Sequence, residues 1–237
     1  MKKLIIASTS TVHGKDYLEY ILPVLSNHFK GVKEILFIPY ARPSGLTFDE
    51  YTEKAKIAFQ KININVVGIH EYTNAVDAVI NAKGIFIGGG NTFLLLKTMY
   101  EKKIMPAIKN VVENGVPYFG TSAGSNVTGL TIQNTNDMPI VYPPTFQAFG
   151  FLNFNLNPHY LDPDPDSKHM GETRETRINE FHNFNTIPVL GLREGSWLQV
   201  EGNQVVLKGD LHARLFQVNK SPQETPPETN LSFLMGL

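Results

Sequence analysis

A short segment bounded by glycines carries the residue best suited to nucleophilic chemistry in this sequence. Gly120-Thr-Ser-Ala-Gly124 directly follows an apolar run and matches the G-x-S-x-G pattern, which holds a serine at a sharp turn after a strand. Small neighbours permit the tight turn and let backbone amides come close to a substrate oxygen. The pattern therefore predicts Ser122 as a nucleophile and the amide of Ala123 as one donor to an oxyanion.

A second glycine-rich segment, Gly88-Gly-Gly-Asn-Thr92, lies between a predicted strand and a predicted helix. Three consecutive glycines leave backbone amides accessible, so this segment could hold an oxyanion or a phosphate. It is neither G-x-G-x-x-G nor a Walker loop with its lysine, which disfavours a nucleotide site. We expect the Gly90 amide to be the second oxyanion donor. We expect Asn91 or Thr92 to cap the helix and Asn91 to contact the substrate.

A serine hydroxyl needs a general base at neutral pH, and histidine commonly serves. Of the seven histidines, His159 is the best placed, because it follows a predicted strand on a loop fixed by Pro158. A carboxylate must then orient the imidazole. Asp137 would give the chain order Ser, Asp, His, whereas Glu194 would give Ser, His, Glu. Spatial adjacency is not visible in a sequence, so both carboxylates are candidates.

Two arginines could bind an acidic substrate. Arg174 and Arg177 lie three residues apart on one face of a predicted helix, and a guanidinium suits bidentate capture of a carboxylate. The same spacing is typical of a solvated helix, because several glutamates lie nearby. The acidic run at residues 162–166 lacks the glycine and final glutamate of a calcium loop. We expect no metal site and no cofactor.

Alternating strands and helices are expected to position these residues. Near-continuous apolar runs predict strands, and apolar stripes at helical spacing predict helices, the first of them bent at Pro23. This alternation indicates an α/β fold with a predominantly parallel sheet flanked by helices, which binds ligands beyond the carboxyl ends of its strands. The predicted strands are 4–7, 34–38, 65–69, 84–87 and 116–119, and the predicted helices are 17–29, 49–59, 75–81, 93–101 and 105–113.

The second half of the chain is less regular. Loops or short strands are expected over 125–170 and a helix over 171–181, followed by strands at 189–192, 197–200, 205–207 and 211–218. We expect one domain over residues 1–219. The last segment, 220–237, contains three prolines and is predicted to be a flexible or loosely attached tail.

Composition excludes several classes of protein. The 237 residues carry 21 basic and 22 acidic side chains, a balance that does not favour a nucleic-acid or membrane-surface binder. The absence of cysteine excludes disulfides, thiolate zinc sites and a cysteine nucleophile. No run of about 18 apolar residues occurs, and the first apolar residues are interpreted as a strand. A cytoplasmic protein that does not bind a membrane is expected.

Read together, these segments resemble peptidase E, the α-aspartyl dipeptidase family of serine peptidases. The resemblance runs from about residue 4 to residue 207 and rests on several motifs in the same order. These are Asp49-Glu-Tyr-Thr52, Gly88-Gly-Gly-Asn-Thr-Phe93, Ser122-Ala-Gly124, Thr135-Asn-Asp-Met-Pro-Ile-Val141, Asn157-Pro-His159, Gly171-Glu-Thr-Arg-Glu175, and Glu194-Gly195 with Trp197.

The resemblance implies a parallel α/β fold similar to class I glutamine amidotransferases and hydrolysis of dipeptides with an N-terminal aspartate. It implies that Ser122 is the nucleophile and His159 its base, with Asp137 or Glu194 as the third member. It further implies that Arg174 binds the side chain of the substrate aspartate. Thr121 stands where the family often has tryptophan, a difference that could alter the pocket wall. The loop after His159 differs in length, which could alter the preference for the leaving group.

Two other functions are compatible with the same residues. The serine could serve an esterase or another amidase, or the glycine-rich segment could belong to a non-catalytic binder of a nucleotide or an acidic metabolite. A small peptide is the expected partner. The sequence does not indicate an oligomeric state.

Overall fold

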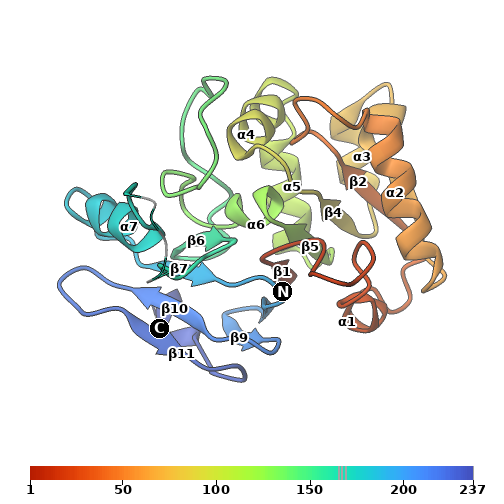
Figure 1. Ribbon diagram of the computed structural model, residues 1–237. Helices are drawn as coiled ribbons and strands as arrows, with labels where there is room; N and C mark the ends of the chain where they lie inside the picture. The colour runs from red at the N-terminus through yellow and green to blue at the C-terminus, as the bar shows by residue number, and fades with distance from the viewer. Residues whose placement is uncertain (165, 167, 169, 237) are drawn as a thin grey trace.

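The chain folds into two sheets with helices packed around them (Figure 1). The computed structural model describes residues 1–164, 166, 168 and 170–236. The larger sheet has the strand order β3-β2-β4-β5-β1-β8-β9 and the smaller one the order β11-β10-β7-β6. The strands are β1 (Lys3–Ala7), β2 (Glu34–Ile38), β3 (Asn65–Gly68), β4 (Ile85–Ile87), β5 (Tyr118–Thr121), β6 (Asn155–Pro158), β7 (Val189–Leu192), β8 (Trp197–Glu201), β9 (Gln204–Lys208), β10 (Ala213–Phe216) and β11 (Gln223–Thr225).

The first five strands form the parallel part of the larger sheet, which confirms the predicted α/β fold. Every neighbouring pair among them is parallel, whereas β8 and β9 complete the sheet as an antiparallel hairpin turning at Gly202 and Asn203. Crossover connections between parallel strands run through helices. These are α1 (Leu22–His28), α2 (Phe48–Gln60), α3 (Ala75–Asn81), α4 (Thr92–Glu101) and α5 (Met105–Glu113).

The helices cover both faces of this sheet, because neighbouring residues of a strand point to opposite sides. Leu4 and Ile6 of β1 pack in the same core as α3, α4 and α5. Ile5 and Ala7 of the same strand pack with α1 and α2 on the other face. Both faces are apolar, as expected for parallel strands buried on two sides. Across the described part of the chain, the helices are all too short or too polar to span a lipid bilayer.

A smaller sheet, not anticipated from the sequence, is built from the second half of the chain. β6 and β7 are parallel, and β10 and β11 add to β7 in antiparallel fashion. Together with α7 (Arg174–His182), these strands lie to the left of the larger sheet in Figure 1. Leu156, Leu190 and Leu192 from β6 and β7 belong to the same core as α4 and α5. The two sheets therefore share apolar contacts.

Two expectations differ from the structure. The first helix begins only at Leu22, so Pro23 lies in its first turn, where a missing amide costs nothing, instead of bending it. The segment after residue 219 packs against the protein: β11 pairs with β10, and the amide of Leu231 donates to Val205 O at 2.7 Å. Leu231, Leu234 and Met235 are buried. Burial of their apolar surface offsets the conformational entropy that the segment loses when it becomes ordered. The three prolines therefore do not leave it a loose tail.

Candidate active site

Ser122 sits at a strained turn between β5 and the short helix α6 (Ala123–Asn126). Its backbone has φ 53° and ψ −110°, a conformation that L-residues rarely adopt and that is typical of nucleophile elbows. The glycine that follows has no room for a side chain, because a Cβ at Gly124 would lie 2.1 Å from Ile87 O. The Ser122 amide donates to Ala7 O at 3.2 Å. The turn is thus tied to β1 and β4, and the serine side chain projects beyond the carboxyl ends of the strands.

The structure brings three of the predicted side chains into one hydrogen-bonded chain. His159 Nε2 lies 3.0 Å from Ser122 Oγ, and His159 Nδ1 lies 2.6 Å from Glu194 Oε1. His159 follows β6 and Glu194 follows β7, and these strands pair in parallel, with Pro158 opposite Leu192. Adjacent carboxyl ends of parallel strands therefore place the imidazole and the carboxylate side by side. In this arrangement His159 can accept the serine proton while Glu194 orients the ring.

A buried serine secures the backbone of His159. Ser8 follows β1, and its hydroxyl donates to Leu192 O at 2.7 Å and accepts from the His159 amide at 2.9 Å. His159 has φ 54°, a second uncommon backbone conformation within the site. Ser8 thus joins the ends of β1, β6 and β7. A polar residue at the end of a strand was the only sequence signal that could have identified it.

Two backbone amides near Ser122 are candidates for binding a substrate oxygen. The Ala123 amide is the first of α6, and the first amides of a helix have no acceptor within that helix. The glycine-rich segment also lies against Ser122, because a Cβ at Gly89 would lie 3.0 Å from Ser122 Cβ. Gly90 has φ +142°, and a Cβ there would lie 2.2 Å from Ala41 O. The amides of its two neighbours are already hydrogen-bonded, that of Gly89 to the Tyr51 hydroxyl and that of Asn91 to Ala41 O. None of the described hydrogen bonds uses the Gly90 amide itself.

Asp137, the alternative partner for the imidazole, makes its contacts elsewhere. Its Oδ2 accepts from the Thr92 amide at 2.7 Å and from the Thr135 hydroxyl at 3.3 Å. The Thr92 amide is the first of α4, so this carboxylate sits at the positive end of the helix dipole. Of the two candidates that the sequence left open, only Glu194 has a hydrogen bond to His159 among the described contacts.

The side chain of Asn91, which was expected to contact the substrate, caps α4. Its oxygen accepts from the Leu94 amide at 3.0 Å, and its nitrogen donates to Met138 O at 2.8 Å. The first bond is a typical N-cap, and the second holds the loop that carries Asp137. Both bonds join Asn91 to other parts of the protein, and they fix the end of the glycine-rich segment.

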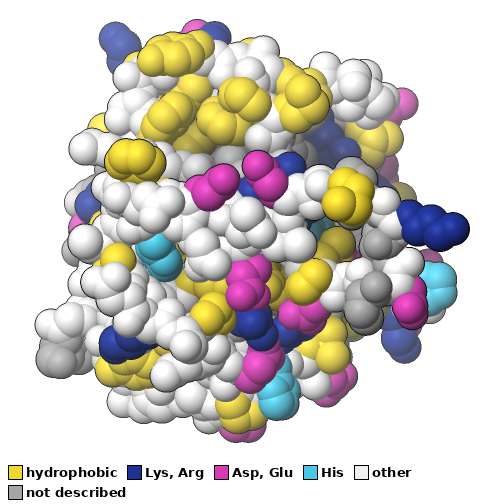
Figure 2. Space-filling model, turned by 60° about the vertical axis from the view of Figure 1, so that its left-hand side comes forward, with side chains coloured by type: hydrophobic (Ala, Val, Ile, Leu, Met, Phe, Trp, Pro, Cys, Tyr) yellow, Lys and Arg dark blue, Asp and Glu magenta, His cyan; other side chains and the backbone are white. Residues whose placement is uncertain are grey.

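Arg174 lies in the first turn of α7, beside a cavity of about 400 Å³ lined by the loop that follows His159. Arg177 also lines this cavity and pairs with Glu172 at 3.6 Å, whereas Arg174 has no ion pair with another described residue. Burial, and secondarily Arg177, lowers the pKa of Arg174, although an arginine stays charged at neutral pH. Figure 2 shows this side of the molecule, where acidic, basic and histidine side chains gather below a band of hydrophobic ones.

Comparison with known proteins identifies the family of the chain. A sequence model described as peptidase family S51 matches residues 4–208. The chain belongs to this peptidase family. It is 44% identical over 237 residues to a probable alpha-aspartyl dipeptidase of Drosophila melanogaster, covering 99% of this chain and 98% of that one. It is also 44% identical to a peptidase E of Streptomyces coelicolor, covering 99% and 95% of the two chains.

Two solved structures share the fold of this S51 peptidase. A peptidase from an acI-B1 actinobacterium superposes with a TM-score of 0.73 at 17% identity, covering 98% of this chain and 97% of that one. A putative peptidase E from Listeria monocytogenes gives a TM-score of 0.66 at 21% identity, covering 88% and 98%. The α/β architecture predicted from strand and helix alternation is thereby found in both solved structures.

Two further residues of this S51 peptidase support the site and were not singled out as site residues from the sequence. Tyr51 of α2 is fully buried, and its hydroxyl accepts from the Gly89 amide at 2.9 Å and lies 3.3 Å from Gly89 O. Arg193 directly precedes Glu194 and holds two carboxylates. Neither role has a local sequence signature, because both depend on contacts between distant segments. Within the described residues, no three His, Asp or Glu side chains are grouped closely enough to hold a metal ion.

Proposed function

We propose that this S51 peptidase is a serine dipeptidase that hydrolyses dipeptides with an N-terminal aspartate, with Ser122 as nucleophile, His159 as general base and Glu194 as the group that orients the imidazole. The observation that carries the proposal is the chain of contacts from Ser122 Oγ through His159, 3.0 Å and 2.6 Å long, to Glu194. Distances in this range permit proton transfer without rearrangement.

The reaction follows from the positions of these groups. Ser122 Oγ attacks the carbonyl carbon of the aspartyl residue while its proton passes to His159 Nε2. The negative charge that develops on the carbonyl oxygen is stabilised by the amides of Gly90 and Ala123. His159 then gives its proton to the leaving amine, and the peptide bond breaks to leave an acyl-enzyme. Water, deprotonated by His159, releases the aspartate and restores the serine.

Arg174 is the group that we assign to the acidic side chain of the substrate. It lines a cavity together with the loop that follows His159 and has no ion pair with another described residue, so a substrate carboxylate would compensate a partly desolvated charge. The names of the relatives support the same specificity, since the Drosophila melanogaster protein is described as a probable alpha-aspartyl dipeptidase.

Hydrolysis of Asp-Leu, Ala-Leu and an aryl ester, with EDTA present, tests the proposal. We expect the wild type to cleave Asp-Leu by far the fastest and Ser122→Ala to lose this activity by at least about 10³-fold. Rapid cleavage of the ester or of Ala-Leu alone would instead indicate an esterase or a different amidase. Tight binding of an acidic metabolite without turnover would indicate a non-catalytic binder.

The role of Arg174 is tested with its neighbour as a control. Arg174→Ala should lower kcat/KM for Asp-Leu by about 30-fold or more, because truncating one partner of a buried charge pair costs about 2 kcal/mol or more. The effect on Ala-Leu should be much smaller. Arg177→Ala, on the same helix but paired with Glu172, should change both substrates little. An equal loss on both substrates in Arg174→Ala would remove this residue from specificity.

A further inference from the structure

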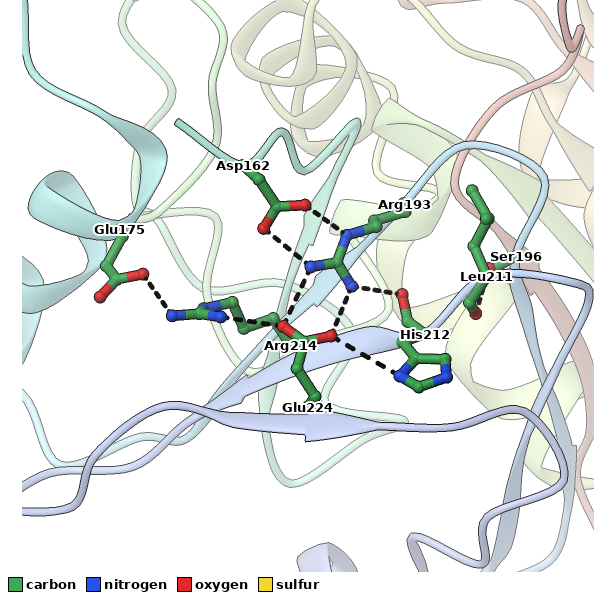
Figure 3. Close-up of polar contacts among 8 residues, drawn as sticks. All are labelled: Asp162, Glu175, Arg193, Ser196, Leu211, His212, Arg214 and Glu224. Carbon is green, nitrogen blue, oxygen red and sulfur yellow. Dashed lines mark hydrogen bonds and ion pairs between the residues drawn. The ribbon is translucent and has the colours of Figure 1, made fainter. Parts of the chain in front are cut away.

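Arg193 uses every N–H group of its guanidinium in hydrogen bonds (Figure 3). Nε and Nη2 donate to the two oxygens of Asp162 at 2.9 and 2.8 Å. Nη1 and Nη2 donate to the two oxygens of Glu224 at 2.9 and 3.0 Å, and Nη1 also donates to His212 O at 2.7 Å. An arginine has five such donors, so none is left over. The side chain is only 14% exposed.

These bonds join the two segments that carry the imidazole and the carboxylate of the site. Asp162 lies three residues after His159, and Arg193 lies one residue before Glu194. The guanidinium also lies 5.5 Å above the ring of Tyr160, which is buried, and the Tyr160 amide donates to Leu192 O at 3.2 Å. The bidentate pair between Arg193 and Asp162 therefore links the segment after His159 to the segment before Glu194. A displacement of either segment would lengthen the contact between His159 and Glu194.

A second arm of the same network reaches the helix that carries Arg174. Glu224 of β11 accepts from Arg214 Nη1 at 2.9 Å, and Arg214 Nη2 donates to Glu175 at 2.8 Å. Glu175 is the neighbour of Arg174 in the first turn of α7. Glu224 is thus shared by both arginines, and Figure 3 shows it between them. Hydrogen bonds from the two arginines, the one from Arg193 first, lower the pKa of Glu224, which keeps this carboxylate charged at neutral pH.

We propose that Arg193 and Arg214 are positioning residues with separate tasks, joined through Glu224: Arg193 holds Glu194 against His159, and Arg214 holds the start of α7 so that Arg174 faces the substrate. The proposal rests on the proposed function. It gives the C-terminal segment, through β11, a part in organising both the catalytic and the specificity side of the site. Isolated ion pairs on a surface contribute little to stability, but bidentate pairs sharing a carboxylate fix geometry.

Charge-conserving variants separate the two tasks. Arg193→Lys keeps the positive charge but cannot form two parallel bonds to each carboxylate. We expect its kcat on Asp-Leu to fall about tenfold, a fraction of what general base catalysis contributes, with KM within about twofold. Arg214→Lys should show the opposite split, with KM for Asp-Leu raised severalfold and kcat within about twofold. Lys208→Gln removes an ion pair to Glu228 in the same C-terminal region and should match the wild type.

Double variants show through which residue each arginine acts. If Arg193 acts through Glu194, adding Arg193→Lys to Glu194→Gln should lower kcat no further, because coupled residues are not additive. Likewise, Arg214→Lys should raise KM no further in an Arg174→Ala background. Glu224→Gln, which keeps the shape of the side chain, should show both defects. Thermal melting establishes that each variant is folded.

The outcomes distinguish this proposal from the function on which it rests. A wild type that does not cleave Asp-Leu in a Ser122-dependent manner would overturn both. An active wild type whose Arg193→Lys and Arg214→Lys variants have unchanged kinetics would overturn only the positioning roles. Equal losses of kcat in both variants, or fully additive effects in the double variants, would also overturn them, since a general structural contribution predicts that result.

Discussion

Ser122 and Glu194 lie at opposite ends of one hydrogen-bonded chain, yet different kinds of contact hold them in place. The serine is supported by buried backbone: its amide bonds to Ala7 O, and the following helix packs against β4 and β5. Tyr51, which holds the neighbouring glycine-rich segment, is also fully buried. This side of the site belongs to the parallel sheet and its two apolar layers.

On the other side of the site, the side chains are held largely by charged groups, several of which lie near the surface. The side chains of His159 and Glu194 are 38% and 49% exposed, and the carboxylates that bind Arg193 and Arg214 are partly exposed as well. These groups come from the smaller sheet, α7 and the loop after His159. Each is brought to the site by a contact between segments distant in sequence.

The difference indicates where activity and stability are coupled. A change beside Ser122 disturbs close packing and buried hydrogen bonds, so it should cost folding free energy along with activity. A change among the exposed charges should cost activity with little loss of stability, because surface ion pairs contribute little to folding. Activity and stability are therefore expected to be coupled on the serine side of the site and largely separate on the histidine and arginine side.

The largest expected effect is on the exposed side, from Glu194→Gln. The amide keeps the size of the side chain but cannot support the imidazole in the same way, and comparable changes in serine hydrolases cost about 10³-fold or more in kcat. The free energy of unfolding should change by less than about 0.5 kcal/mol, as for other surface substitutions. Steady-state kinetics on Asp-Leu and urea unfolding measure the two quantities.

Asp137→Asn is the matched control for this variant. Asp137 contacts the start of α4, so its replacement should cost about 1 kcal/mol of stability and lower kcat less than tenfold. The reverse ranking, with Asp137→Asn nearly inactive and Glu194→Gln nearly normal, would make Asp137 the partner of His159.

Tyr51→Phe probes the buried side and should have an intermediate effect. Without the hydroxyl, the Gly89 amide loses its acceptor, which should cost about 1–3 kcal/mol in the free energy of unfolding. The adjacent Gly90 amide would shift, and kcat should fall about tenfold, less than the loss expected on deleting an oxyanion donor outright. Kinetics on Asp-Leu and urea unfolding test both parts.

Tyr17→Phe is the control for this effect, because the Tyr17 ring packs 6.3 Å from that of Tyr51 and none of the described hydrogen bonds joins its hydroxyl to the glycine-rich segment. An equal loss of kcat in Tyr17→Phe would attribute the Tyr51 effect to packing in general. A Tyr51→Phe variant that loses activity but no stability would break the coupling inferred for this side.

The smallest effect on activity is expected at His28, which instead influences how stability depends on pH. Its Nε2 lies 3.0 Å from Tyr118 O in β5, the strand that leads to Ser122. Burial lowers the pKa of His28 to about 4, although its hydrogen bond to Tyr118 O opposes the shift. The unfolded chain therefore binds a proton more readily than the folded one, and stability is lost as pH falls from about 6.5 towards 4. Between pH 7 and 5, His28 should account for about 2 kcal/mol of that loss.

Urea unfolding of the wild type and His28→Gln at the two pH values tests this expectation. Glutamine can still donate to Tyr118 O but does not titrate, so the variant should lose less stability on acidification. His212→Gln serves as a control, because that imidazole is 53% exposed. Identical pH dependence in the wild type and His28→Gln would remove His28 from the acid response.

Much of the larger sheet and the location of Ser122 could be predicted from the sequence because their signals are local. Apolar runs marked β2 and β4 within a residue, and helical spacing marked α3 at its observed bounds. The glycines on either side of Ser122 indicated a sharp turn, which the backbone of Ser122 adopts. Periodicity and turn chemistry act over a few residues, and so a sequence displays them directly.

Only the tertiary structure decided which carboxylate meets His159 and what becomes of the C-terminal segment. Asp137 and Glu194 look equally suitable along the chain, and the pairing of β6 with β7 brings Glu194, 35 residues from His159, to the imidazole. The prolines after residue 219 suggested a loose tail, yet Glu224 binds two arginines there. Such contacts join segments far apart in the chain, and their free energy depends on the folded arrangement of both partners, which no local pattern encodes.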